Sequence, residues 1–253
     1  MIPKITGRTG ETEEFARYEF KYVLSARQRA VIEEEISHFM IFDGHVHEEL
    51  ENCYLVRSLY FDDVAATNYY EKIDGVRARH KFRIRTYGQE QKVNLPIYLE
   101  LKGRHIERTF KHRIAITPAH LPILTDPERH HEFLDSFPGH WLAEKFVFES
   151  YRKRLRPKVL IDYVRRPYTS EFDLNFRVTF DDRLTSTAVS ELFVGHDQSW
   201  RRNLPGYTIL EVKFHRRIPA WFHRILQANN LRRVSISKFC KGMEVCDLAV
   251  NLS

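Results

Sequence analysis

The stretch Ile97-Tyr98-Leu99-Glu100-Leu101-Lys102 alternates apolar and charged side chains, and this alternation decides the fold. Successive side chains of a β-strand point to opposite faces, so its two charged residues share one face and its leucines share the other. The Glu-x-Lys triplet of this stretch recurs in Glu19-Phe20-Lys21 and in Glu211-Val212-Lys213. The period of two predicts β-strands that each carry one charged face and one apolar face.

Strands of this kind recur along most of the chain. The alternation predicts eight of them, at residues 17–24, 54–61, 81–87, 97–102, 109–114, 158–168, 175–182 and 207–214. A turn at Gly103-Arg104 is expected to join the fourth strand to the fifth. Helices are expected at residues 25–39, 64–72, 128–152, 219–228 and 237–248. They interrupt the strands irregularly, which disfavours a doubly wound parallel sheet and favours an antiparallel α+β barrel.

The composition is that of a folded protein with a basic balance. Of the 253 residues, 43% are hydrophobic, which supports a sizeable core and excludes global disorder. No linker divides the sequence, so residues 1–253 are expected to form a single domain. The formal net charge of +6 fits a polyanionic partner, without choosing among nucleic acid, polyphosphate, nucleotide and acidic lipid.

The sequence also bears on compartment and anchoring. Its three cysteines form no CxxC pair, which argues against a disulfide scaffold and favours a reducing, cytoplasmic location. Residues 1–15 lack the apolar segment of a signal peptide, and no stretch approaches the ~18 apolar residues of a membrane span. No direct membrane insertion is therefore expected, and coupling to a membrane would need a membrane protein encoded separately.

The charged strand faces allow two geometries. In one, the apolar faces fill a core and the charges face water. In the other, the sheet closes with its charges inward, and helices cover the outer apolar faces. An inward ring of Arg and Lys repels itself, so it needs a wide, hydrated lumen or a bound anion. Polyphosphate oxygens meet that need, because Arg binds them in a bidentate manner and Lys binds them as a point charge. Both geometries remain open on the pattern alone.

Nine short blocks, in order along residues 17–242, resemble one known family. They are Arg17-Tyr18-Glu19-Phe20-Lys21-Tyr22, Ser58-Leu59-Tyr60-Phe61-Asp62, Arg83-Ile84-Arg85, Leu99-Glu100-Leu101-Lys102, Phe110-Lys111, Tyr163-Val164-Arg165, Arg177-Val178-Thr179-Phe180-Asp181, Leu210-Glu211-Val212-Lys213 and Ser237-Lys238-Phe239. The chain resembles the VTC domain, the catalytic polyphosphate polymerase domain of the vacuolar transporter chaperone complex. That domain belongs to the triphosphate tunnel metalloenzyme superfamily, with the CYTH phosphatases as relatives.

The resemblance implies an eight-stranded antiparallel β-barrel, or tunnel, with a polar basic lumen and helices packed outside. It implies a metal-dependent polyphosphate polymerase that transfers a phosphoryl group from ATP to a growing polyphosphate chain and releases ADP. It also implies Mn²⁺ or Mg²⁺ as cofactor and no nucleic-acid partner. The implied catalytic residues are Arg83, Arg85, Lys102 and Lys238. The implied phosphate ligands are Lys21, Lys111, Arg165, Arg177, Lys213 and Lys241, and the implied metal ligands are Glu211, Glu100 and Glu19.

Two departures from the family pattern keep other functions open. CYTH relatives have an acidic residue where this chain has Arg17, which argues against a hydrolase that needs more carboxylates. The family polymerase often has a lysine three residues before Lys238, where this chain has Ser235, so Lys241 is expected to replace that contact. The alternatives are a tripolyphosphatase or nucleoside triphosphatase in the same tunnel, and a polyphosphate-binding module without catalysis. The sequence has no Gly-x-x-x-x-Gly-Lys-Ser/Thr motif, which excludes a P-loop NTPase.

Overall fold

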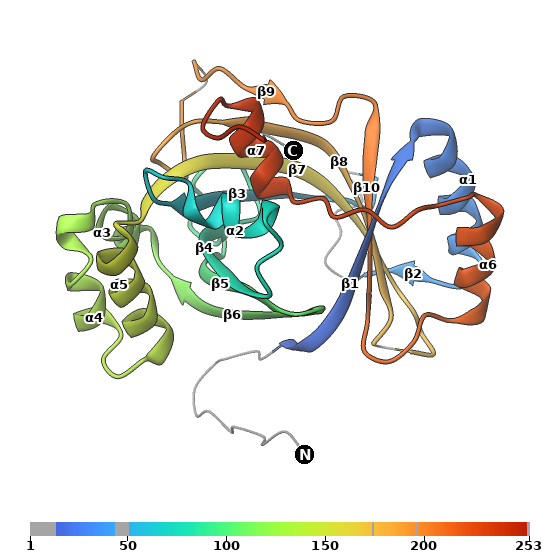
Figure 1. Ribbon diagram of the computed structural model, residues 1–253, viewed down its shortest axis with the longest axis horizontal. Helices are drawn as coiled ribbons and strands as arrows, with labels where there is room; N and C mark the ends of the chain where they lie inside the picture. The colour runs from blue at the N-terminus through green and yellow to red at the C-terminus, as the bar shows by residue number, and fades with distance from the viewer. Residues whose placement is uncertain (1–13, 44–50, 174, 196, 252–253) are drawn as a thin grey trace.

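Eight long strands pair side by side and close into a ring (Figure 1). The computed structural model describes residues 14–43, 51–173, 175–195 and 197–251. The ring strands are β1 (Glu14–Ser25), β3 (Tyr54–Asp62), β4 (Ala78–Thr86), β5 (Ile97–His105), β6 (Arg108–Ile116), β7 (Arg156–Thr169), β8 (Arg177–Thr187) and β10 (Tyr207–Phe214). Their order is β7-β3-β4-β5-β6-β1-β10-β8, and β8 pairs with β7 to complete the circle. The predicted antiparallel α+β architecture with eight strands is therefore confirmed.

All pairings between these strands are antiparallel, and two strands of two residues each, β2 (Ile41–Phe42) and β9 (Arg201–Arg202), extend the sheet. The register places opposite charges across from each other. On β1 and β10, Glu19 lies opposite Lys213 and Lys21 lies opposite Glu211. The two Glu-x-Lys triplets thus run against each other, which favours this register because each carboxylate meets an ammonium group.

Helices cover the outside of the ring at its two ends. The helices α1 (Ala26–Ser37) and α6 (Ala220–Ala228) pack on the apolar faces of β1, β8 and β10. The helices α3 (Leu121–Thr125), α4 (Glu132–Ser136) and α5 (Trp141–Lys153) pack on those of β3 to β6 at the other end (Figure 1). Burial of these apolar faces supplies most of the stabilisation of the fold. The strands can therefore direct their charged faces inward.

A third apolar cluster lies on the inner face of the ring. Val56, Ile161 and Tyr163 of β3 and β7 pack against Phe239 and Met243 of α7 (Lys238–Val245), with α2 (Thr67–Ile73) alongside. A methyl group at Gly242 of α7 would lie 2.8 Å from the side chain of Ile161. The helix α7 therefore sits tightly against the inner wall, and its first residue projects into the lumen.

Two local predictions were wrong. The helix expected at residues 128–152 is broken into a short 3-10 turn (Pro127–Arg129), α4 and α5, because Gly139 has a φ of +69° and follows a proline. The turn expected at Gly103-Arg104 lies at Ile106-Glu107, and β5 continues to His105. Gly103 pairs with Phe110 inside the sheet, where the Phe110 ring occupies the space that a glycine side chain leaves free.

No helix in the described ranges is long and apolar enough to cross a lipid bilayer.

Candidate functional site

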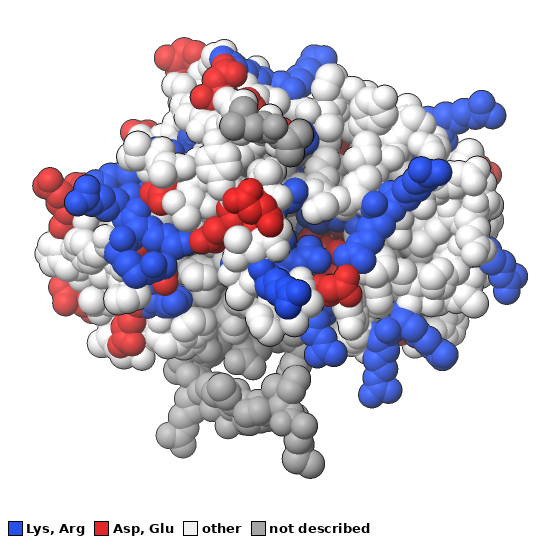
Figure 2. All heavy atoms as spheres, viewed as in Figure 1, with Lys and Arg blue, Asp and Glu red and all other residues white. Residues whose placement is uncertain are grey.

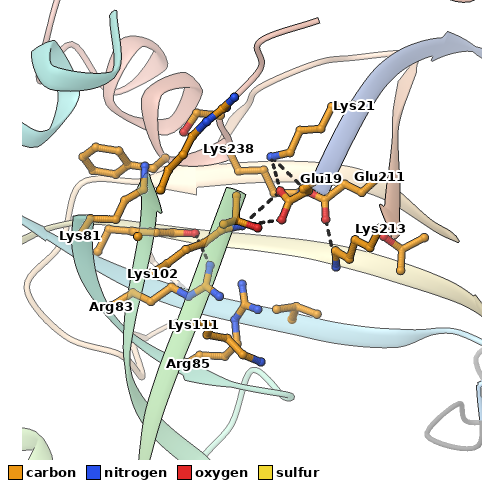
Figure 3. A pocket seen from close by; sticks show the side chains of 18 of the residues that line it. Glu19, Lys21, Lys81, Arg83, Arg85, Lys102, Lys111, Glu211, Lys213 and Lys238 are labelled. Carbon is orange, nitrogen blue, oxygen red and sulfur yellow. Dashed lines mark hydrogen bonds and ion pairs between the residues drawn. The ribbon is translucent and has the colours of Figure 1, made fainter. Parts of the chain in front are cut away.

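The ring encloses a cavity of about 1180 Å³ with a strongly charged lining. Among the described residues, sixteen Lys and Arg residues line the cavity, compared with four Asp and Glu residues. Figure 3 shows charged side chains from opposite strands directed toward one common space. The charged strand faces therefore point inward, as in the second of the two geometries that the sequence allowed. A lining of this kind creates a positive field that attracts anions.

Most of the residues singled out from the sequence lie in this lining. They are Glu19, Lys21, Arg83, Arg85, Lys102, Lys111, Arg165, Arg177, Glu211, Lys213 and Lys238. Ser235 lines the cavity too.

Two of the singled-out residues lie outside the lining. Glu100 is fully buried behind Arg83 and serves as its counter-ion. Lys241 lies on α7, where its ammonium group donates to Glu244 at 2.5 Å, so its side chain is bound within the helix. The geometry therefore does not support Lys241 as the substitute for a lysine at position 235.

One wall of the cavity, formed by β3, β4 and β5, holds two arginines in fixed orientations. The Arg83 guanidinium donates to Glu100 Oε2 from Nε at 2.8 Å and to the Tyr60 hydroxyl at 2.8 Å. The Arg85 guanidinium donates to Ser58 Oγ at 3.0 Å and to the hydroxyl of Tyr163, on β7, at 3.1 Å. Both arginines are at least nine-tenths buried. Both residues line the cavity, and a guanidinium has five N–H donors, so each has donors beyond those that these partners occupy.

The opposite wall, formed by β1, β8, β10, the Arg165 end of β7 and the start of α7, is organised around Glu211. Its carboxylate accepts from Lys238 at 2.7 Å and from Arg165 at 3.1 Å. The ammonium groups of Lys21 and Lys213 lie 3.3 Å and 3.4 Å from it. Four cations therefore surround one buried carboxylate, and three of them also pair with a second one, Glu19 or Asp181.

Two further carboxylates hold cations of this second wall. Glu19 lies 3.2 Å from Lys21 and 3.1 Å from Lys102, which links β1 to β5 past the intervening strand β6. Asp181 accepts a bidentate pair of hydrogen bonds from Arg165, at 2.6 Å and 2.7 Å, and it lies 2.5 Å from Lys238. These carboxylates fix the positions of the cations, as bidentate and charge-assisted bonds do.

The electrostatic environment keeps these carboxylates ionised. Burial alone would raise the pKa of Glu211, but the surrounding Lys238, Lys21, Lys213 and Arg165 hold it well below its usual range. Burial would likewise raise the pKa of Glu19, and Lys102 and Lys21 lower it well below its usual value. Both groups remain acceptors at neutral pH, and neither is a strong base.

Two groups of the lining have pKa values displaced to near neutrality. Burial, together with the positive charge of Arg165, lowers the pKa of Lys213 to about 7. Burial would raise the pKa of Tyr60, but Arg83, Arg85 and Lys81 outweigh it and lower the pKa to about 7. The free cavity therefore reduces its own excess of positive charge by deprotonation as the pH rises through neutrality.

Arg177 and Lys111 complete the set of singled-out cations. Arg177, at the start of β8, forms an ion pair with Asp43, which follows β2. Lys111 of β6 lies opposite Lys102 of β5 in the register, so two lysines stand side by side on adjacent strands. Like charges at this spacing repel unless an anion or carboxylate lies between them.

Sequence reasoning left several residues unassigned that the structure places in or behind the lining, among them Lys81, Tyr60, Tyr163 and Asp181. Lys81, with its ammonium group 4.6 Å from the Phe239 ring centre, lies on the same face of β4 as Arg83, so strand parity was a usable signal. Tyr60 and Tyr163 orient the arginines, and Asp181 holds Arg165. Strand parity also places Tyr163 on the face of Arg165 and Asp181 on the face of Arg177, but it could not give their hydrogen-bond partners, because these lie on other strands.

A metal ion would find two carboxylates in the inner lining, Glu19 and Glu211. Within the part of the chain that the structure describes, no group of three or more His, Cys, Asp and Glu is placed to hold a metal ion. Mg²⁺ held together with phosphates uses one or two protein carboxylates and completes its coordination with phosphate oxygens and water. The two carboxylates therefore fit an ion that binds together with a phosphate ligand.

Comparison with protein families gives one match. The family model described as "VTC domain" matches residues 16–246, which is nearly the entire chain. A comparison with curated proteins finds no match.

Comparison with solved structures supports the fold. A putative adenylyl cyclase, HpAC1, from Hippeastrum, whose description reports a dominant triphosphatase activity, superposes with a TM-score of 0.52 and 14% identity, over 90% of this chain and 93% of that one. A putative adenylate cyclase from Bacillus halodurans superposes with a TM-score of 0.51 and 13% identity, over 89% and 94% of the two chains. At these identities the likeness shows the tunnel fold.

Proposed function

Because the chain belongs to the VTC domain family, we propose that it transfers the γ-phosphoryl group of ATP to the end of an inorganic polyphosphate chain and releases ADP. The observation that carries the proposal is the enclosed cavity in which lysines and arginines from opposite walls face one space. A chain of condensed phosphates has the charge and the linear shape that such a lumen accepts. We place the reaction in the cytoplasm, where ATP is available.

Positioning and charge neutralisation account for the reaction without a protein base. The attacking group is a terminal phosphate oxygen of the acceptor, which is already ionised at neutral pH. It attacks the γ-phosphorus of ATP, the bond from that phosphorus to the bridging oxygen breaks, and ADP leaves with that oxygen. Arg83, Arg85 and Lys102 stabilise charge on the transferred group and on the leaving phosphate. Tyr60 and Glu100 hold Arg83 in place before substrate arrives, so little reorganisation is needed.

Glu211 and Glu19 are the residues that would hold Mn²⁺ or Mg²⁺. When bound, such an ion supplies positive charge to the oxygens of the phosphate groups. Glu211 is also the common partner of Lys21, Lys213 and Lys238, so it positions these cations around the phosphates. Glu100 is assigned the role of positioning Arg83, because its carboxylate lies behind that guanidinium and outside the lining.

A triphosphatase is the second candidate, and one observation favours it. The solved Hippeastrum relative, whose description reports triphosphatase activity, has the same fold over most of its length. Hydrolysis, however, requires a group that activates water, and the low pKa values of Glu19 and Glu211 make both weak bases. The lining therefore suits an acceptor that needs no deprotonation. A third candidate, binding of polyphosphate without catalysis, rests on the uncharged Ser235 in the lining.

One assay separates the three functions. Purified protein is incubated with ATP and Mn²⁺, and ADP, orthophosphate and polymeric phosphate are quantified. The proposal predicts polyphosphate together with ADP in amounts that match. Orthophosphate without polymer identifies the triphosphatase, and unchanged ATP despite measurable binding identifies the binding module. Either of these last two results overturns the polymerase proposal.

A further inference from the structure

A second, smaller cavity of about 360 Å³ adjoins the tunnel cavity. Its lining consists of Lys72, Ile73, Gly75, Arg77, Arg79, Arg104, Ile106 and Ser235. Four of these eight residues, Lys72, Arg79, Arg104 and Ser235, also line the tunnel cavity, so the two cavities share part of their walls. Figure 2 shows Lys and Arg side chains across the middle of one face of the molecule, with Asp and Glu side chains among them.

The cations of this outer cavity are held close to one another by the backbone. Arg79 of β4 lies opposite Arg104 of β5 in the register, which places two guanidinium groups on adjacent strands. The amide of Ile106 donates to the carbonyl of Arg77 at 2.8 Å, which ties the β5–β6 turn to the segment between α2 and β4. The Arg104 Nε donates to the carbonyl of Ile106 at 2.7 Å. The cluster is thus fixed by hydrogen bonds to main-chain oxygens, which carry no full charge.

The structure gives these cations no counter-ion of their own. In residues 14–43, 51–173, 175–195 and 197–251, no carboxylate forms an ion pair with Lys72, Arg77, Arg79 or Arg104. The nearby Glu71 is engaged by Lys153 at 3.0 Å. Burial and the neighbouring Arg104 lower the pKa of Arg79, in keeping with unrelieved repulsion. Opposed like charges on adjacent strands are destabilising, so a bound anion would relieve them.

We propose that this outer cavity binds the part of a polyphosphate chain that extends beyond the tunnel. The proposal rests on the proposed function, because it takes the ligand of the tunnel to be a condensed phosphate. The wall shared with the tunnel favours this ligand over a nucleic acid, since a chain that leaves the tunnel beside Arg79 and Arg104 meets the cations of the outer cavity next. The outer site would hold chains longer than the tunnel and leave the binding of short ones unchanged.

The test compares long and short ligands in binding experiments that require no turnover. The variant Arg77→Gln removes one charge, at a residue that lines the outer cavity and not the tunnel cavity. Arg216→Gln, at an exposed position outside both cavities, removes the same charge and serves as the control. Affinities are measured for a polyphosphate of about one hundred phosphates and for tripolyphosphate. Circular dichroism melts establish that each variant is folded, and Arg77→Lys retains the charge with a different side chain.

The proposal predicts a selective loss. The outer-site variant should bind long polyphosphate about tenfold more weakly, with a salt dependence that is shallower by about one in the slope of log affinity against log salt. Tripolyphosphate should bind within twofold of wild type, and the control and the Lys variant should behave like wild type. Unchanged affinity for the long chain, or equal losses for both ligands, overturns the outer site. Equal displacement by single-stranded RNA would also overturn it, because the surface would then be a general polyanion site.

Failure of the proposed function has a different signature. If wild type makes no polymer but binds long polyphosphate better than the outer-site variant does, the polymerase proposal falls and the outer site stands. If wild type polymerises ATP and the variants bind both ligands alike, the outer site falls and the polymerase stands.

Discussion

At the scale of single residues, Arg83 shows how the tunnel prepares a cation for its ligand. Its guanidinium is bound by Glu100 on one side and by Tyr60 on another, both of them buried. A guanidinium fixed in this way loses little conformational freedom when phosphate binds. Its orientation is therefore set before the substrate arrives, and its removal should affect the transition state more than the fold.

Arg83→Ala should lower the rate of phosphoryl transfer by about 10²-fold or more, which is the usual cost of losing a preorganised donor. The measurement is kcat for ADP release together with a thermal melt. Arg224→Ala, at an exposed position on α6, is the matched control and should retain wild-type turnover. Wild-type turnover in Arg83→Ala would refute the assignment of this arginine to the site.

Glu211→Gln should abolish turnover and raise the Mn²⁺ concentration needed for any residual activity, because the variant loses one of two carboxylates in the inner lining. We expect the protein to remain folded, since an amide of the same size replaces the carboxylate. A metal titration of activity and a far-ultraviolet dichroism spectrum check both points. Full turnover with an unchanged metal requirement would contradict the role of Glu211.

Affinity for tripolyphosphate should fall as the pH rises from 6 to 9. Lys213, with a pKa of about 7, loses its positive charge over this range, and Tyr60, also with a pKa of about 7, gains a negative one. Bound phosphate favours the protonated forms, so binding at pH 8 should take up protons. Calorimetry in buffers of different ionisation enthalpy measures this uptake.

Variants at the two groups separate their contributions. Lys213→Met and Tyr60→Phe should each flatten the pH dependence of binding, because each removes one titrating group. Proton release on binding at pH 8, or an affinity that rises with pH, would show that these groups do not face the ligand.

At the scale of elements, strand parity made most of the site predictable. Each strand has one apolar face covered by helices and one charged face, so the alternation marks Lys21, Arg83, Lys102 and Glu211 without coordinates. The alternation could not tell inside from outside, since both geometries have the same period. That distinction came from the resemblance to a tunnel family and from the ring closure in the structure.

Other features of the elements could not be predicted because they depend on distant partners. Tyr60 and Tyr163 look like ordinary apolar strand residues until closure brings their hydroxyls to Arg83 and Arg85. The assignment of Lys241 relied on sequence proximity to Lys238, whereas the helix directs its ammonium group to Glu244. The break between α4 and α5 lies within a segment of helical composition. The left-handed backbone conformation of Gly139 interrupts the helix there.

The strand β5 contains one glycine whose replacement tests the sheet. In Gly103→Ala the new methyl carbon would lie 2.0 Å from the Phe110 ring, so the ring must move. The free energy of unfolding should fall by about 1–3 kcal/mol, as for other overpacked sites. Chemical denaturation measures the change, and Gly103→Ala/Phe110→Leu should recover part of it. An unchanged denaturation midpoint in Gly103→Ala would show that the Phe110 side chain moves aside without a loss of stability.

At the scale of the whole molecule, the excess of positive charge inside the ring makes the free protein strained and the loaded protein stable. Tripolyphosphate at one hundred times its Kd should stabilise the fold by about 2.7 kcal/mol. For a chain of this length that corresponds to a rise in Tm of about 5–10 °C. Differential scanning fluorimetry measures it, with sodium chloride at equal ionic strength as the control. A Tm unaffected by tripolyphosphate would show that the lumen does not take condensed phosphate.

The pairing of β1 with β10 has a consequence for how the molecule is made. Lys21 and Glu211 stand opposite each other although 190 positions separate them along the chain. Contacts between such remote segments form late and slowly. During synthesis, the edge of β1 that pairs with β10 therefore stays unpaired until the ribosome has synthesised β10. An incomplete chain that lacks β10 cannot close the ring. The anion-binding lumen therefore forms only after β10 has been synthesised.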